Sequence, residues 1–376
     1  MTNQTGNISK QRLTSIDAFR GFTIAGMILV LNPGNWKINY PILKHADWHG
    51  WTIADLVFPF FLFIVGVSIA FSFSNNKKED LTQSSIYIKI IKRSIILFII
   101  GLFINSFPDF NFNEFRLMGV LQRIAICYAI VSILFLNTKY STQAMIAVSL
   151  LFIYWALMAW IPLPGNFIGS YNKGENVATY FDKLVLKGLM GSYEKLGEPE
   201  GIISTLPSLS TTLFGVLTGH FLKLKKDVKI TAAFMLAVGV ILFTIGLIWD
   251  KWLPINKHLW TSSYSTLTAG LALILFSSFY YLIDGLKYKK WAKPFIVFGM
   301  NAITVYVLSI VFGKVIKMIT FSFNGIIYHP RSWLYEVVLI DPFGKYGASL
   351  VYALLYITFW CSIMWILYNK KIFIKV

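Results

Sequence analysis

The feature that most limits the fold of this chain is a series of long apolar segments separated by polar ones. Ten of them have about the 17 to 25 residues that a helix needs to cross a bilayer. The chain has 376 residues, 56% hydrophobic and 14% charged, which is too apolar for an ordinary soluble domain. We predict an all-α polytopic membrane protein that forms one domain over residues 1–376 and has about ten transmembrane helices. The predicted spans are residues 16–31, 52–73, 86–107, 118–136, 143–161, 204–222, 230–249, 264–283, 294–312 and 348–367.

The distribution of lysine and arginine predicts how these spans are oriented. With ten spans, 20 of the 34 basic residues but only 5 of the 17 acidic ones fall on the side that holds both termini. The positive-inside rule assigns this side to the cytoplasm. We therefore expect a multi-pass protein of the cytoplasmic (inner) membrane with cytoplasmic tails at residues 1–15 and 368–376. The net charge of +17 then reflects membrane topology, and nucleic acid is not an expected partner.

The connections on the opposite side are longer and richer in polar and aromatic residues, as loops that carry function commonly are. The largest is the predicted extracytoplasmic loop at residues 162–203. Residues 314–346 are predicted to be extracytoplasmic or re-entrant, because their apolar part is too short to span a bilayer. Cys127 and Cys361 both lie in apolar segments, so neither a disulfide nor a metal site is expected.

One of these connections, at residues 44–59, is unusually dense in polar and aromatic side chains next to a predicted span. His45 and His49 are four residues apart, and Asp47 and Trp48 stand between them. Zinc is not supported, because neither an HExxH pattern nor a suitable third ligand accompanies the histidines. One histidine could act as a general base or nucleophile, oriented by a neighbouring carboxylate. Alternatively, both histidines are polar anchors in an interfacial loop.

Two charged residues lie one helical turn inside predicted spans, where an unpaired charge is costly. Asp55 follows the histidine segment, and Arg123 ends the sequence Gly-Val-Leu-Gln-Arg in a later span. A structural ion pair between the two would satisfy both. The guanidinium of Arg123 is equally suited to bind a phosphate or carboxylate group of a ligand.

Three further polar residues mark the ends or the interior of spans. Arg20 follows Asp17 by three residues, which suits either a helix-end ion pair or a basic entrance for an anionic cofactor. Asn32 ends the first span and either caps the helix or orients a substrate. Asn301 is a single amide in an apolar segment, where such groups usually bridge helices.

Several of these segments together resemble the heparan-alpha-glucosaminide N-acetyltransferase family of transmembrane acyltransferases. They occur in the family's order within about residues 12–310. The matching segments are Asp17-Ala18-Phe19-Arg20-Gly21, residues 45–59, Gly119-Val120-Leu121-Gln122-Arg123, Glu198-Pro199-Glu200-Gly201, Asn256-Lys257 with Leu259-Trp260, and Gly299-Met300-Asn301.

The resemblance implies an enzyme that takes acetyl from cytosolic acetyl-CoA and transfers it to the amine of a glucosamine residue across the membrane. The family's catalytic histidine lies in a His-Ala-x-Trp motif, which here assigns the role to His45 and not to His49. Its asparagine at the end of the preceding span corresponds to Asn32. The implied partners are acetyl-CoA, an amino-sugar or glycan acceptor and the lipid bilayer, and related membrane enzymes suggest a homodimer.

Acetyl transfer needs a base, donors for the tetrahedral oxyanion and a site for the anionic groups of CoA. In this scheme His45 is the base or a transient acetyl carrier, and Asp47 or Asp55 holds its ring. Asn32 and Asn256 would donate to the oxyanion or to sugar hydroxyls. The remaining predicted roles are Arg123, Lys257 and Arg20 for the acyl donor, and Trp48, Glu200 and Asn301 with Asn256 for the acceptor.

Two other functions fit the same residues. The acceptor could be a sugar hydroxyl, which would make the protein an O-acetyltransferase of a surface glycan. A solute transporter would instead use Asp55, Arg123 and Asn301 to line an intramembrane pathway.

Overall fold

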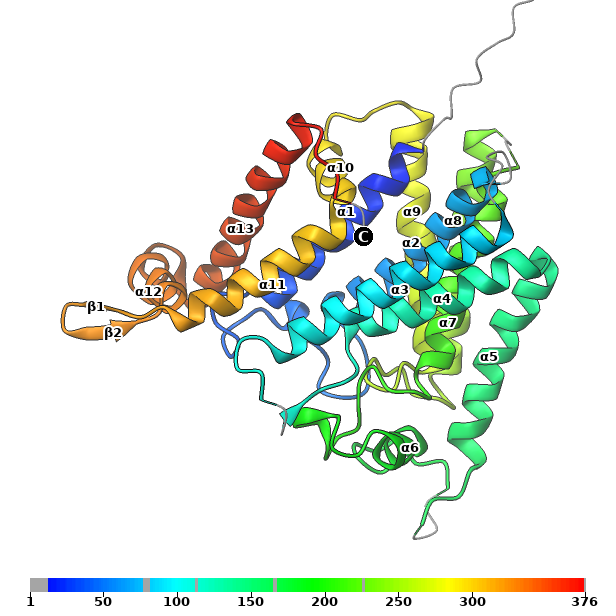
Figure 1. The fold of residues 1–376 in the computed structure, drawn as a ribbon, viewed down its shortest axis with the longest axis horizontal. Helices are drawn as coiled ribbons and strands as arrows, with labels where there is room; N and C mark the ends of the chain where they lie inside the picture. Colours follow the sequence, from blue (N-terminus) through cyan, green and yellow to red (C-terminus); the bar gives the residue numbers. More distant parts are fainter. Residues whose placement is uncertain (1–12, 77–81, 112–113, 165–167, 225–226, 375–376) are drawn as a thin grey trace, which may run out of the picture.

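The computed structural model describes residues 13–76, 82–111, 114–164, 168–224 and 227–374 (Figure 1). Most of the predicted amino-terminal tail therefore lies outside the described residues. The same holds for part of the basic clusters that predicted the topology, namely Lys10, Arg12, Lys77, Lys78, Lys225, Lys226 and Lys375. The described part is helical except for its loops, two isolated bridges and one two-stranded hairpin, which confirms the predicted all-α class.

Long helices form at each predicted span. Seven helices are long and apolar enough to cross a membrane, and the number is eight if one bent pair forms a single span. Two others fall outside this set, because α3 carries three basic residues and α7 is rich in serine and threonine. The long helices are α1 (Thr14–Leu31), α2 (Ile53–Asn76), α3 (Gln83–Ser106), α4 (Val120–Asn137), α5 (Tyr140–Trp160), α7 (Thr205–Leu222), α8 (Val228–Trp249), α9 (Ser262–Phe279), α11 (Ala302–Met318) and α13 (Ile340–Asn369).

The predicted span at 294–312 is not one straight helix, so this part of the prediction was wrong. It consists of α10 (Lys293–Met300) and α11, which meet at an angle of 83°. Asn301 stands at the bend with a non-helical backbone. Its side chain donates to the carbonyl of Ile372 at 3.1 Å and accepts from the amide of Ile374 at 2.9 Å. The carboxyl-terminal segment thus satisfies both the donor and the acceptor of the side-chain amide at the break.

The segment at 314–346 is more structured than the sequence indicated. Helix α11 continues to Met318, and a hairpin of β1 (Phe321–Phe323) and β2 (Ile326–Tyr328) follows. A short α12 (Pro330–Trp333) and a π-helical turn then lead into α13, which begins eight residues before the predicted span. In Figure 1 the hairpin projects away from the bundle.

The centre of the bundle depends on a close approach of α2 and α7. A Cβ atom on Gly215 would lie 1.9 Å from the backbone oxygen of Phe63, and one on Gly66 would lie 1.9 Å from that of Thr212. Only glycine fits at these crossings, as is common where membrane helices pack through small residues. The two helices thus form a rigid support for the residues at their ends.

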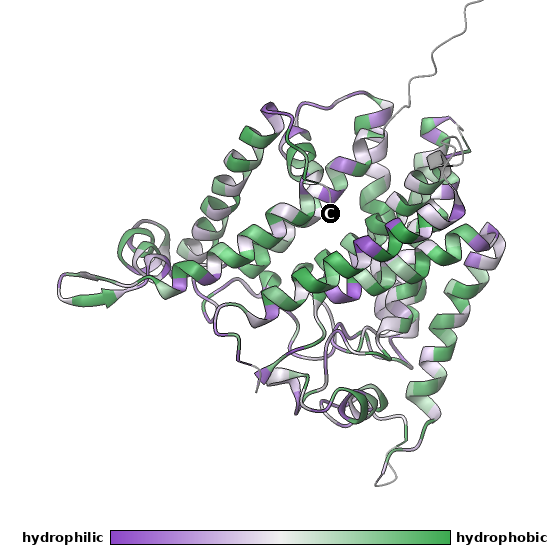
Figure 2. Ribbon diagram, viewed as in Figure 1, coloured by the Kyte–Doolittle hydropathy of each residue, from purple (hydrophilic) through white to green (hydrophobic). Residues whose placement is uncertain are grey.

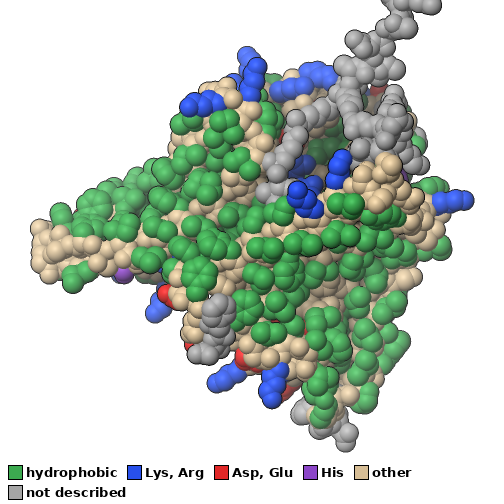
Figure 3. All heavy atoms as spheres, viewed as in Figure 1, with side chains coloured by type: hydrophobic (Ala, Val, Ile, Leu, Met, Phe, Trp, Pro, Cys, Tyr) green, Lys and Arg blue, Asp and Glu red, His purple; other side chains and the backbone are tan. Residues whose placement is uncertain are grey.

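The outer surface has the distribution of a membrane protein. Helices are mostly apolar and loops mostly polar (Figure 2), and Lys and Arg side chains gather above and below a broad apolar region (Figure 3). In α5 and α8 only 28% of the most apolar window is buried, and the exposed residues include Phe152, Ile241 and Ile245. These helices therefore present apolar side chains outward, as contact with lipid requires.

The long loops gather at one end of the bundle, opposite the beginning of α1 and the end of α13 (Figure 1). The amide of Gly50 donates to the carbonyl of Ile255 at 2.8 Å, which joins the first loop to the loop after α8. The indole of Trp48 donates to the carbonyl of Tyr171 at 2.8 Å, which joins it to the long loop that contains α6 (Val177–Val185). Loops distant in sequence thus form one polar cap.

The α2–α7 crossing can be tested with one methyl group. We expect Gly215→Ala to lower the free energy of unfolding by about 2 kcal/mol or more, since the new Cβ meets backbone that cannot move independently. Gly26→Ala is the matched control, because its Cβ would lie 3.3 Å from a movable methyl group of Val57. Thermal melting in detergent compares the variants, and equal melting temperatures would contradict this packing.

Candidate active site

The carboxylate of Asp55 is the centre of the polar cap. Thr52 is the residue directly before α2, and Asp55 stands in its first turn. The Asp55 side chain reaches back to Thr52, as the acidic residue of a capping box does. Its Oδ2 accepts from the backbone amides of Thr52 at 3.0 Å and Ala46 at 3.1 Å. The side chain is 1% exposed, so these donors replace water. The sequence Thr-x-x-Asp thus fixes both the start of α2 and the direction of the carboxylate.

The other oxygen of Asp55 orients His45. The distance from His45 Nδ1 to Asp55 Oδ1 is 2.7 Å. A neutral imidazole that donates this hydrogen bond keeps its lone pair on Nε2. The His45 side chain is 39% exposed, whereas its partner is buried. The pair therefore presents an oriented imidazole at the surface of the cap, which is the geometry of a general base or nucleophile.

Lys257, from the loop after α8, completes this cluster. Its Nζ lies 3.5 Å from Asp55 Oδ1, and 3.0 and 3.2 Å from the two ring nitrogens of His45. Burial lowers the pKa of Lys257, while the carboxylates of Asp55 and Glu200 oppose that shift. The ammonium group is thus held beside the paired imidazole and near the Asp55 carboxylate.

Asn256 shapes the loop that carries this lysine. It is fully buried, and its Oδ1 accepts from the amide of Leu259 at 2.9 Å. Its Nδ2 lies 3.4 Å from His49 Nδ1, which links the loop to the histidine segment. Asn256, which the sequence predicts to bind the acceptor sugar, therefore lies inside the cap, and its side-chain oxygen already accepts a hydrogen bond from the backbone.

The two aromatic neighbours of the cluster pack against each other. The rings of Trp48 and His258 are 5.4 Å apart at their centroids. Burial, assisted by the positive charge of Lys257, lowers the pKa of His258 to about 4. Burial also lowers the pKa of His49. These two histidines are therefore neutral near pH 7, and only His45 is paired with a carboxylate at hydrogen-bond distance among the described residues.

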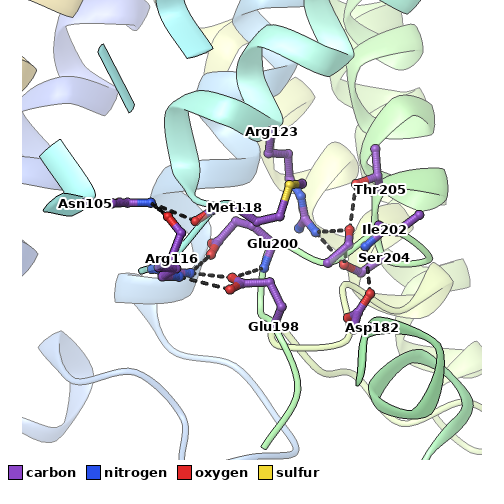
Figure 4. Close-up of polar contacts among 11 residues, drawn as sticks. Asn105, Arg116, Met118, Arg123, Asp182, Glu198, Glu200, Ile202, Ser204 and Thr205 are labelled. Atoms are coloured by element: carbon purple, nitrogen blue, oxygen red, sulfur yellow. Dashed lines mark hydrogen bonds and ion pairs between the residues drawn. The ribbon is translucent and has the colours of Figure 1, made fainter. Parts of the chain in front are cut away.

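A second charged network lies beside the first and is drawn in Figure 4. Arg116, in the loop before α4, donates to Glu198 at 3.0 and 2.5 Å and to Glu200 at 2.5 Å. Burial alone would raise the pKa of Glu200, but Arg116 and Arg123 lower it. Glu200 was predicted as a site residue from the sequence, whereas Arg116 and Glu198 were not. Two glutamates so close together before a span nevertheless indicate that a cation must lie next to them.

Arg123 does not pair with Asp55, so that predicted alternative was wrong. Its guanidinium is fully buried and donates to the carbonyl of Gly201 at 3.1 Å and to Ser204 (Figure 4). It also lies 5.0 Å from the centre of the Trp260 ring. Its Nε and Nη1 have no hydrogen-bond partner in the described structure. Arg123 therefore holds the start of α7 against α4, and its role toward the acyl donor stays a prediction.

Asn32 ends α1, and its Nδ2 donates to the carbonyl of Ile28 at 3.0 Å, as a helix-capping amide does. Its side chain also lines a cavity of about 250 Å³ at the cap end of the bundle. Arg116 lines the same cavity, which places Asn32 next to the second network. Both readings of this residue, as a cap and as a ligand for substrate, are thus compatible with its position.

Three predicted site residues lie outside these networks. Arg20 bonds with Asp17 at 3.3 Å and with Ser68 at 2.7 Å, toward the end of α1 opposite the cap. Asn301 binds the carboxyl-terminal segment at that same end. Asp47 is exposed and makes no hydrogen bond with a described residue, so the imidazole is oriented by Asp55.

The helical bundle and its polar cap define a multi-pass membrane protein with a candidate site at one end. Residues 12–249 match the family model described as heparan-alpha-glucosaminide N-acetyltransferase, catalytic, and the chain belongs to this family. It is 28% identical to the heparan-alpha-glucosaminide N-acetyltransferase of Mus musculus over 428 residues, which cover 99% of the chain and 62% of the relative. With the protein of that name from Homo sapiens the values are 29% over 420 residues, 97% and 60%. The chain thus spans about three fifths of the length of these curated relatives.

Asp182 of α6 gives the cap a pH dependence that can be measured. Burial raises the pKa of Asp182 to about 6, although the amide of Ile202 donates to it at 2.9 Å. An unfolded aspartate has a pKa of about 3.9. The folded protein therefore holds the proton more tightly, and the stability gained from it decreases as the pH rises from about 4 to about 6.

We expect Asp182→Asn to remove this dependence. The stability of the wild type relative to the variant should fall by up to about 3 kcal/mol over that interval and stay constant above it. Melting temperatures between pH 4 and 7.5 give the comparison, with exposed Asp341→Asn as the control. If the melting temperatures of the wild type and Asp182→Asn change with pH in the same way, the raised pKa of Asp182 is refuted.

Proposed function

We propose that this chain is a membrane acetyltransferase that moves acetyl from acetyl-CoA to the amine of a glucosamine-type sugar on the extracytoplasmic side. The observation that carries the proposal is the accessible His45 imidazole oriented by the buried Asp55 carboxylate. The family model and the names of the relatives support the donor and the acceptor. The cytoplasmic membrane as its location, cytoplasmic termini and a homodimer belong to the same proposal.

In this reaction the amine nitrogen attacks the thioester carbonyl, and a C–N bond forms as the C–S bond breaks. His45 Nε2 accepts the amine proton and returns it to the departing CoA thiolate, so that the enzyme ends unchanged. Asp55 stabilises the imidazolium that exists between these two transfers. The buried carboxylate is therefore a requirement for catalysis in addition to its part in the fold.

Lys257 has to release the imidazole before the imidazole can act as a base. Its Nζ is nearly equidistant from the two ring nitrogens, at 3.0 and 3.2 Å, and a positive charge this close to the ring opposes formation of the imidazolium. The developing oxyanion of the tetrahedral intermediate is a stronger acceptor. We propose that Lys257 moves to this oxygen, or to an anionic group of the donor, when acetyl-CoA binds.

His45 can also act in two steps, first taking the acetyl group and then passing it to the amine. This route allows acetyl-CoA to exchange with labelled CoA when the acceptor is omitted. Direct transfer does not allow that exchange. Measurement of isotope exchange therefore separates an acetyl carrier from a base.

The two other predicted functions receive less support. An O-acetyltransferase would use the same base, but the names of the relatives specify an amine. A transport pathway would need Asp55, Arg123 and Asn301 to line one route, whereas Asp55 and Asn301 lie at opposite ends of the bundle and Arg123 is enclosed by the loop before α7. Analysis of the acetylated product separates the two acceptors, because an amine gives an amide and a hydroxyl gives an ester.

The choice of His45 over His49 gives the first test of this proposal. We expect His45→Gln to lose acetyl transfer to labelled glucosamine acceptor by about 10²-fold or more, because the base or carrier is removed. His49→Gln keeps the paired imidazole and should retain activity within a few fold. The assay uses protein in liposomes with radiolabelled acetyl-CoA, and turnover by His45→Gln at the wild-type rate would exclude this mechanism.

The two carboxylates beside the imidazole give a matched second pair of variants. Asparagine at position 55 can still accept from the amides of Ala46 and Thr52, but it cannot stabilise an imidazolium. We expect Asp55→Asn to lower kcat by about 10²-fold or more, with little change in the thermal shift caused by acetyl-CoA. Asp47→Asn should resemble the wild type. If Asp47→Asn shows the larger loss of kcat, Asp55 is not the residue that orients the base.

A further inference from the structure

A cationic cavity at the cap end of the bundle has no part in the mechanism above. It has a volume of about 250 Å³ and lies among the ends of α1, α3 and α11 and the start of α4. A water molecule occupies about 30 Å³ in the liquid, so the cavity has room for an oxyanion group and part of the molecule that carries it. Four cationic side chains line it, namely Arg116, Lys314, Lys317 and Arg331.

Three of these cations form no ion pair with a carboxylate among the described residues, although the charge of Asp109 acts on Lys314 from the neighbouring hollow. Lys314 donates to the carbonyls of Ile104 and Phe107 at 2.7 and 2.6 Å, and Arg331 donates to the backbone of the segment after α1. Lys317 makes no hydrogen bond or ion pair with a described residue. Arg116 alone is neutralised, by Glu198 and Glu200. Like charges gathered in one partly enclosed cavity repel each other unless an anion joins them.

The acidic residues near this region lie outside the cavity. A second hollow of about 390 Å³ shares Asn105, Lys314 and Lys317 with it and adds Asp109 and Glu114. Within the described residues, no aspartate or glutamate lines the inner cavity. The charged side chains that line the inner cavity are therefore all positive, and Asp109 and Glu114 line only the second hollow.

Gln122 provides an independent sign that a ligand belongs there. Its side chain lines the cavity and is 1% exposed, yet neither its oxygen nor its nitrogen has a hydrogen-bond partner. Helix α3 leaves room for it, because a Cβ on Gly101 would lie 2.4 Å from the Gln122 oxygen. A buried amide without partners is destabilising, and a polar ligand would satisfy it.

We propose that this cavity binds an oxyanion group of a ligand, a sulfate, carboxylate or phosphate, between Lys317, the other cations and the Gln122 amide. Two ligands of the proposed function could supply the group: an acidic substituent on the amino-sugar acceptor, or a phosphate of CoA. Asn32 lines the same cavity, which places the bound group next to a predicted active-site amide. The choice between these sources rests on the proposed function, whereas oxyanion binding itself does not.

Calorimetry on the purified full chain tests this site with four probes at constant ionic strength: glucosamine 6-sulfate, glucosamine, CoA and inorganic sulfate. The variants are Lys317→Gln and Gln122→Leu. Lys251→Gln removes the same charge from an exposed position that does not line the cavity. We expect each cavity variant to raise the Kd of the anionic ligand that uses the site, and of sulfate, by about tenfold. Glucosamine binding should stay unchanged, and the control should match the wild type.

The ligand that loses affinity identifies the source. Weaker binding of glucosamine 6-sulfate assigns the cavity to the acceptor, and weaker binding of CoA assigns it to the donor. Unchanged affinities in Lys317→Gln and Gln122→Leu, or a wild type that binds none of the anionic probes, would overturn the proposal. A higher melting temperature of Gln122→Leu with unchanged affinities would show that the amide is simply unsatisfied. Failure of the acetyl-transfer proposal would instead appear as turnover by His45→Gln, and sulfate binding does not depend on it.

Discussion

A carboxylate buried at the beginning of a membrane helix must be given donors by the protein, because neither lipid nor bulk water supplies them. Asp55 receives them from the backbone of Ala46 and Thr52, from the ring of His45 and from Lys257. Two loops far apart in sequence are therefore fixed by one charge. The same requirement that folds the cap leaves an imidazole oriented and accessible, so the stability of the loops and the chemistry of the site have one physical origin.

The second network extends this arrangement across the cap. Arg116 is bound by Glu198 and Glu200, and the field of Glu200 reaches Lys257 in the first network. Arg123 then ties the same loop to α4 through Gly201. Alternating charges thus continue from the paired imidazole to the cationic cavity. An anionic ligand in that cavity would lie at the end of a connected set of charges, which offers a physical basis for coupling between ligand binding and the position of Lys257.

The spans could be predicted from sequence because the length of an apolar segment is a local property, but partners across loops could not. Asn301 resembles a helix-bridging amide, but it stands at a bend in its segment. Its partners lie 71 and 73 residues later in the chain, which a local pattern does not reveal. Asp55 and Arg123 stand at similar depths, which suggested an ion pair, but each has closer partners in a different loop. Arg116 is recognisable only when the loop with Glu198 closes over it, whereas His45 was identified because its motif is continuous.

A structure of the chain with acetyl-CoA bound in a lipid nanodisc would test the central claim most directly, since it locates the reacting carbon relative to the paired imidazole. Reacting atoms in a productive complex lie about 3 to 3.5 Å apart. We expect the thioester carbonyl carbon within about 5 Å of His45 Nε2, close enough for direct attack or for one amine nitrogen between them, with the Asp55 hydrogen bond intact and Lys257 moved away from the ring. A thioester beside His49, or a bound donor whose acetyl group does not reach the polar cap, would contradict the account.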